Sequence, residues 1–96
     1  MTELTPGQLE RLAMLAEECN EIAQVAMKIA RFGYDSYHPD APNINNTERL
    51  ISELHDLFAI SGIMVAKGDI PPLSVPDDEM DYRMKRKISW MRHFKE

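Results

Sequence analysis

A ten-residue run, LFAISGIMVA at residues 57–66, constrains the fold of this chain more than any other feature. It forms the second half of a helix predicted from Asn46 or Thr47 to Lys67, with Gly68 in the position where helices commonly end. A helix that is apolar on all sides must be buried on all sides. The rest of a 96-residue chain offers too little surface to cover it. The sequence therefore predicts a helical core that other copies of the chain complete.

A first helix is predicted over residues 6–31 by signals at both of its ends. Thr5 is a favourable N-cap, Pro6 suits the first turn, and Gln8 lies where a capping box requires it. Gly33 follows as the stop. Between them, small and apolar residues recur at helical spacing: Leu9, Leu12, Ala16, Cys19, Ala23, Ala26 and Ala30.

The seven-residue spacing of Ala16, Ala23 and Ala30 would let another helix approach the first helix closely on that side. A third helix is predicted to carry an apolar stripe of larger residues: Met80, Met84, Ile88 and Met91. Both faces indicate packing between helices. Because no strand pattern competes with them, we expect one all-α domain over residues 1–96.

The connections between the helices differ in kind. Residues 34–46, YDSYHPDAPNINN, are rich in Pro, Asn and Asp and predict a loop that is long for a helical bundle. Residues 69–76 contain three prolines and predict an ordered connection. Acidic residues after Pro76 favour the start of the third helix there, and Arg92 and Lys95 are expected near its end.

Composition narrows the function classes. A net charge of −5 argues against stable nucleic-acid binding, although six basic residues and no acidic one lie within residues 83–95. The single cysteine, Cys19, suits a reducing compartment, and no signal peptide or membrane span is visible. We expect a cytoplasmic protein that does not bind membranes.

Two pairs of acids stand in apolar surroundings. Glu18 and Glu21 are three residues apart on the first helix, and Glu53 and Asp56 have the same relation on the second, so each pair shares a helix face. In an antiparallel hairpin the four carboxylates converge and repel one another unless a cation is bound. Oxygen ligands on rigid helices suit Mg²⁺, or Mn²⁺ as an alternative. An ordinary solvated polar face is the competing interpretation.

The text EECNE at residues 17–21 followed by ELHD at residues 53–56 resembles the paired E-x-x-E and E-x-x-D signature of MazG-like nucleoside triphosphate pyrophosphohydrolases. The resemblance covers roughly residues 8–68. This part of the chain is similar to small members of the family, many of them encoded by phages. It implies a helical bundle completed by dimerisation, sometimes as a dimer of dimers. It also implies Mg²⁺-dependent cleavage of a nucleoside triphosphate to monophosphate and pyrophosphate, in the host cytoplasm if the protein is phage-encoded.

The resemblance also implies roles for individual residues. Those implied as metal ligands are Glu18, Glu21, Glu53 and Asp56. Glu17 matches the place of a water-activating carboxylate, so Glu17 and Glu21 are the candidate catalytic bases. The chemistry of a triphosphate, not the resemblance, adds candidates for binding substrate: Lys28, Lys85, Arg86 and Lys87 for the phosphates and Tyr37 for the base. The competing interpretations are a solvated basic face for the four cations and an aromatic that anchors its own loop for Tyr37. The segment between the acid pairs is longer than in compact members, and the basic text DYRMKRKISWMR matches the family in charge but not in register.

Two other functions fit the same residues. One is a base-specific relative on the same scaffold, acting on dUTP, dCTP or phosphoribosyl-ATP. The other is a non-catalytic dimerisation module that binds metal or nucleotide without turnover. His55, between two expected ligands, is expected beside the site or in an interface, because it points about 100° away from its neighbours on a helix.

Overall fold

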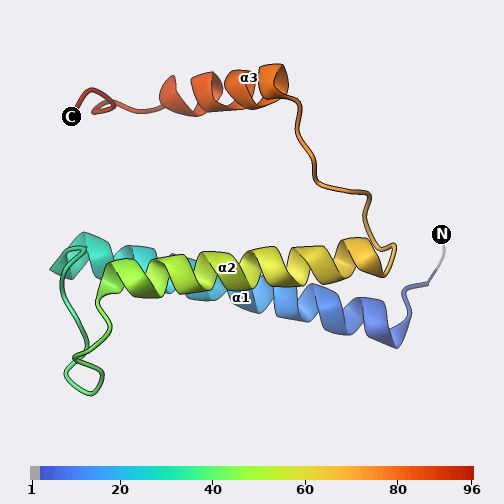
Figure 1. The fold of residues 1–96 in the computed structure, drawn as a ribbon, viewed down its shortest axis with the longest axis horizontal. Coiled ribbons are helices and arrows are strands. Elements are labelled where there is room, and N and C mark those ends of the chain that lie inside the picture. The colour runs from blue at the N-terminus through green and yellow to red at the C-terminus, as the bar shows by residue number, and fades with distance from the viewer. Residues whose placement is uncertain (1–2) are drawn as a thin grey trace.

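The computed structural model describes residues 3–96, which form three helices (Figure 1). They are α1 (Pro6–Phe32), α2 (Asn46–Ala66) and α3 (Asp77–Ile88). α1 and α2 lie side by side and antiparallel, whereas α3 lies apart from both (Figure 1). Within residues 3–96 the only extended pairing is one isolated bridge between Tyr37 and Asn45. The all-α prediction is confirmed. None of the helices described here has the length and apolar character needed to span a membrane.

Both ends of α1 follow the predicted signals. The hydroxyl of Thr5 accepts a hydrogen bond from the Gln8 backbone N–H at 3.1 Å, and the Gln8 side chain accepts one from the Thr5 N–H at 2.9 Å. The two bonds form a complete capping box. At the other end, Gly33 has φ 92° and ψ 164°, a conformation open essentially to glycine alone. The helix therefore stops where the glycine turns the backbone away.

α2 is also bounded by local chemistry. The Asn45 side chain accepts a hydrogen bond from the Glu48 N–H at 2.9 Å and caps the first turn. Lys67 caps the C-terminal end, and Gly68 follows with φ 77°. The predicted start near Asn46 and the predicted glycine after the last turn are both confirmed.

The inner seam of the hairpin, where α1 and α2 pack together, has alternating spacings of three and four residues on both helices. On α1 its members are Arg11, Leu15, Glu18, Ile22, Val25 and Ile29. On α2 they are Asn46, Leu50, Glu53, Leu57, Ile60 and Met64. All are buried or half-buried, and Val25, Ile60 and Met64 form the buried apolar core of the described residues.

The loop end of the hairpin is fixed by hydrogen bonds across residues 33–47. Asn46, only 5% exposed, donates from its side chain to the Gly33 carbonyl at 3.1 Å, and its backbone N–H donates to the Ser36 carbonyl at 2.8 Å. The Thr47 N–H donates to the Tyr34 carbonyl at 3.1 Å. The long loop is therefore attached to the start of α2 and does not extend freely from the hairpin.

The open end of the hairpin is fastened by an ion pair between distant residues. Arg11 donates from Nη2 to Asp69 Oδ1 at 2.9 Å and from Nε to the other carboxylate oxygen. The side chains are only 17% and 10% exposed. Such two-point pairing fixes the orientation of both groups. It joins the beginning of α1 to the segment that follows α2.

A single chain leaves much apolar surface exposed. Within the run at residues 57–66 only Ile60 and Met64 are buried, while Phe58 is 66% and Ile63 is 46% exposed. The alanine row of Ala16, Ala23 and Ala30 is also exposed, because α2 packs on the inner seam instead. The helix that this row was expected to admit is thus not α2.

α3 packs against neither of the other helices. The Cα radius of gyration is 16.9 Å, whereas a compact domain of this length would have about 12–13 Å. The prediction that α3 reaches Arg92 and Lys95 is wrong, because the helix ends at Ile88. There the Ser89 hydroxyl donates to the Arg86 carbonyl at 2.6 Å, and the Trp90 and Met91 N–H groups bond three residues back. These bonds form tight turns in place of a further helical turn.

Candidate metal site

Three of the four expected ligands converge at the middle of the hairpin. Carboxylate oxygens of Glu18, Glu53 and Asp56 all lie within 4.8 Å of one another. Glu18 comes from α1, and the other two come from α2, one turn apart. The antiparallel packing of α1 and α2 therefore brings together three of the four carboxylates that were expected to converge, and Glu21 is not among them. We call these three residues the acid cluster.

Two members of the acid cluster occupy inner-seam positions, where apolar side chains normally lie. Glu18 follows Leu15 by three residues and precedes Ile22 by four. Glu53 stands in the same relation to Leu50 and Leu57 on α2. A carboxylate at such a position loses hydration without gaining an apolar contact, which is costly unless a partner compensates it.

The described residues supply only part of that compensation. One oxygen of Glu18 and one of Glu53, Oε2 in each case, are buried and have no hydrogen-bond partner. None of the ion pairs among residues 3–96 involves the acid cluster. Buried polar atoms in folded proteins are nearly always paired. A cation held by the acid cluster could compensate these two carboxylates.

Electrostatics at the acid cluster favour protonation or a bound cation. Burial raises the pKa of Glu18, and repulsion from Glu21 and Asp56 raises it further. A side-chain hydrogen bond with Glu21 raises the pKa of Glu53, followed by burial and by repulsion from the other acids. Glu21, the fourth expected ligand, is thus beside the cluster, with its side chain more exposed than those of Glu18 and Glu53.

A hard divalent cation fits these residues. The converging donors are all carboxylate oxygens held on two helices, and two of the three residues also have a buried oxygen without a hydrogen-bond partner. Such a set suits Mg²⁺ or Mn²⁺, which bind a few carboxylates and keep room for water and phosphate oxygens. The acid cluster could therefore hold a metal ion.

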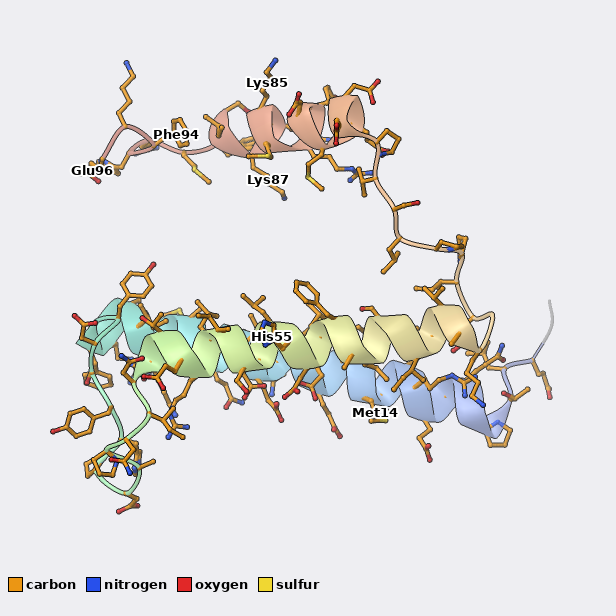
Figure 2. All side chains as sticks on the ribbon, in the orientation of Figure 1. Met14, His55, Lys85, Lys87, Phe94 and Glu96 are labelled. Atoms are coloured by element: carbon orange, nitrogen blue, oxygen red, sulfur yellow. The ribbon has the colours of Figure 1, made fainter. Side chains whose placement is uncertain are left out.

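The other expected site residues are divided between two places. Glu17 is exposed on α1, next in sequence to Glu18. Lys28 and Tyr37 line a pocket at the loop end of the hairpin. Lys85, Arg86 and Lys87 lie on α3, away from the acid cluster of the same chain; Figure 2 shows Lys85 pointing away from the hairpin and Lys87 pointing toward it.

His55 lies outside the acid cluster, as its position on the helix predicts. Its side chain is exposed, and its ring centroid is 6.4 Å from that of Phe58, with the planes tilted by 41°. Phe58 is itself one of the most exposed apolar residues of α2. The two rings belong to the apolar surface that the single chain leaves uncovered.

Two features of the site were missed in the sequence. The inner-seam placement of Glu18 and Glu53 was visible as carboxylates within a repeat of three and four residues, L-x-x-E-x-x-x-I and L-x-x-E-x-x-x-L. Arg49, which lines the same pocket as Lys28, lies one helical turn before Glu53. That spacing places Arg49 on the same face as Glu53.

Compared with family models, curated proteins and solved structures, the chain gives no match.

Proposed function

We propose that the chain is a metal-dependent nucleoside triphosphate pyrophosphohydrolase of the MazG-like kind. The observation that carries the proposal is the convergence of Glu18, Glu53 and Asp56 from two helices, where Glu18 and Glu53 each have one buried carboxylate oxygen without a hydrogen-bond partner. A polyanionic substrate needs a cation to approach such a site, and a triphosphate brings the phosphate oxygens that Mg²⁺ prefers. The resemblance of EECNE and ELHD to that family's signature supports the same reaction.

The acid cluster would hold Mg²⁺, or Mn²⁺ in its place, through Glu18, Glu53 and Asp56. When bound, the ion supplies charge neutralisation on the phosphoryl oxygens. Glu21, beside the cluster, or the exposed Glu17 accepts the proton of the attacking water. Water attacks the α-phosphorus, the bond to the bridging oxygen breaks, and pyrophosphate leaves. The products are a nucleoside monophosphate and pyrophosphate.

Oligomerisation belongs to the proposal. The single chain buries few apolar side chains and exposes Phe58 and Ile63 on α2 together with the alanine row on α1. A second copy that packs on these surfaces supplies the cover that the run at residues 57–66 requires. The basic residues of α3 lie away from the acid cluster of their own chain. In an oligomer they would reach phosphates bound at the acid cluster of a partner subunit.

The test is pyrophosphate release from a panel of ribo- and deoxyribonucleoside triphosphates with Mg²⁺, Mn²⁺ or EDTA. We expect release with Mg²⁺ or Mn²⁺ and none with EDTA. Glu53→Gln keeps the size of the side chain and removes a ligand charge, so we expect turnover to fall by at least about a hundredfold. Glu10→Gln, at an exposed position of α1, is the matched control.

The outcomes of this test separate the proposed reaction from its alternatives. Turnover confined to one base would favour a base-specific relative on the same scaffold. A folded protein that binds Mg²⁺ but hydrolyses no triphosphate would favour the non-catalytic module. Glu53→Gln turnover equal to wild type would exclude the acid cluster as the site of the reaction.

A further inference from the structure

A second feature of the hairpin is a pocket of about 300 Å³ where α1, the long loop and α2 meet. We call it the loop pocket. Its lining residues are Lys28, Phe32, Ser36, Tyr37, His38, Pro39, Asn46 and Arg49. Its volume is at the lower end of the range for small-molecule sites, so a ligand of roughly nucleoside size is the scale it suits.

The loop pocket continues the face that carries the acid cluster. Lys28 lies seven residues, two helical turns, after Glu21, and Arg49 lies four residues before Glu53. On both helices a cation thus follows the carboxylates toward the loop. At 1.5 Å per residue, these steps are about 10 Å on α1 and about 6 Å on α2. Along one face of the hairpin, the order toward the loop is therefore carboxylates, then cations, then aromatic rings.

The chemistry of the loop pocket matches one class of ligand. Phe32, Tyr37 and His38 supply flat surfaces on which a base can stack. Lys28 and Arg49 supply positive charge for a phosphate, and arginine can bond two phosphate oxygens at once.

The wall of the loop pocket also offers a hydrogen-bond acceptor. Asn46 is 5% exposed, and its Nδ2 donates to the Gly33 carbonyl at 3.1 Å. That bond fixes which end of the carboxamide is the oxygen. The oxygen of this carboxamide receives no hydrogen bond from residues 3–96, so it would be the acceptor for a base N–H in the proposed complex.

We infer that the loop pocket binds the nucleoside and α-phosphate part of the nucleotide, with its base against Tyr37 and Phe32. Lys28 and Arg49 reach its α-phosphate at the end of the pocket nearest the acid cluster. The inference rests on the proposed function for the direction of the remaining phosphates, which would extend toward the acid cluster. It does not need turnover, because a nucleoside monophosphate has every group that the pocket recognises. The acid cluster and the loop pocket are then two halves of one elongated site.

The experiment measures binding of AMP, GMP, CMP and UMP by calorimetry or NMR in EDTA, with ribose 5-phosphate as the base-free probe. We expect at least one monophosphate to bind at least about tenfold more tightly than ribose 5-phosphate, because stacking adds affinity. Tyr37→Ala should weaken that binding about five- to a hundredfold. Arg49→Ala should weaken it by at least about tenfold.

Matched controls are Tyr34→Ala and Arg31→Ala, because both side chains are exposed and neither lines the loop pocket. Neither control should change monophosphate binding more than about twofold. Circular dichroism of each variant checks the fold. The comparison of AMP, GMP, CMP and UMP with ribose 5-phosphate uses the wild-type protein, so a variant that unfolds does not remove the test.

Failure of this inference is distinguishable from failure of the proposed function. If every monophosphate binds no better than ribose 5-phosphate, or if Tyr37→Ala and Arg49→Ala bind like the controls, the loop pocket is not the nucleoside site, even where triphosphates are hydrolysed. If monophosphates bind in a manner sensitive to Tyr37 and Arg49 while no triphosphate is hydrolysed, the loop pocket stands as a nucleotide site and the proposed reaction fails.

Discussion

At the scale of single residues, the chain places charge where its own packing pattern calls for apolar side chains. Glu18 and Glu53 interrupt the inner seam with carboxylates, each with one buried oxygen that lacks a partner. Burial and repulsion from neighbouring acids raise the pKa of Glu18, and a hydrogen bond with Glu21, burial and repulsion raise the pKa of Glu53. The ionised forms of both therefore oppose folding of the metal-free chain. The proposed metal ion would offset this loss of stability at both positions.

Replacing Glu53 by leucine should therefore stabilise the metal-free protein. The new side chain extends the apolar seam between Leu50 and Leu57 and removes a repelled carboxylate. We expect the melting temperature of Glu53→Leu in EDTA to exceed that of wild type, and the rise produced by Mg²⁺ in wild type to disappear. Glu10→Gln, exposed on α1, should change neither value. A lower melting temperature for Glu53→Leu would mean that the acid cluster contributes to stability without metal.

A second residue-scale prediction concerns Asp69, whose pKa is lowered by the hydrogen bonds that Arg11 donates. A carboxylate with a lower pKa in the fold contributes stability above its unfolded pKa, about 3.9. That contribution is lost as the pH falls through the folded value. Asp69→Asn should therefore lower the melting temperature at pH 7, and its difference from wild type should shrink as the pH falls below about 4.

The control for Asp69→Asn is Glu79→Gln, which breaks an exposed pair with Arg83, 2.8 Å apart on α3. Exposed pairs of this spacing contribute about 0.3–0.5 kcal/mol. Glu79→Gln should thus leave the melting curve nearly unchanged from pH 3 to 7. A difference between wild type and Asp69→Asn that is constant down to about pH 2 would show that the ion pair is not its cause.

At the scale of elements, helix boundaries follow from residues within one turn, whereas helix placement does not. The Thr5 capping box, the Asn45 cap and the glycines at positions 33 and 68 bound α1 and α2 at the predicted places because each acts locally. The end of α3 at Ile88 could not be derived in this way. No glycine or proline stops the helix there, and basic residues beyond it favoured continuation.

The same contrast holds for the candidate site. Spacing within each helix predicted the two acid pairs, and the antiparallel hairpin then brought Glu18 to Glu53 and Asp56. The ion pair between Arg11 and Asp69 joins residues that are 58 positions apart, so no local sequence pattern predicts it. The loop pocket likewise depends on how residues 34–46 fold back on the helices. Contacts between segments that are distant in the sequence can be identified only from the three-dimensional structure.

Gly33 is the element boundary most sensitive to substitution. Its φ of 92° and ψ of 164° lie in a region that side chains with a Cβ rarely enter. We expect Gly33→Ala to cost about 1–3 kcal/mol in the free energy of unfolding, measured by urea denaturation. Asp35→Ala, at an exposed position of the same loop, should stay within about 0.5 kcal/mol of wild type. Equal stabilities for Gly33→Ala and Asp35→Ala would show that the backbone at residue 33 can relax.

At the scale of the whole molecule, one chain is a hairpin with a separate third helix, and the buried apolar core of residues 3–96 is limited to Val25, Ile60 and Met64. So small a core does not offset the conformational entropy of ordering the chain. The exposed faces are complementary in size. α1 presents small residues such as Ala16 and Ala23, whereas α2 presents the bulky Phe58. Large side chains on one helix can thus pack against small ones on a neighbour.

A charged residue on that surface of α2 should therefore separate the subunits. We expect light scattering of wild type to give at least twice the chain mass of 11.1 kDa. The 66% exposure of Phe58 in the single chain means that Phe58→Lys places its charge in solvent if no partner covers it, and in an apolar interface if one does. We expect Phe58→Lys to be monomeric and to have a lower melting temperature that no longer depends on protein concentration.

The control is Tyr34→Lys, at a position that is also exposed but lies in the loop, and this variant should remain an oligomer. If wild type is a stable monomer, or if Phe58→Lys assembles as wild type does, the apolar run at residues 57–66 must be covered in another way, and α3 of the same chain is then the element left to do it.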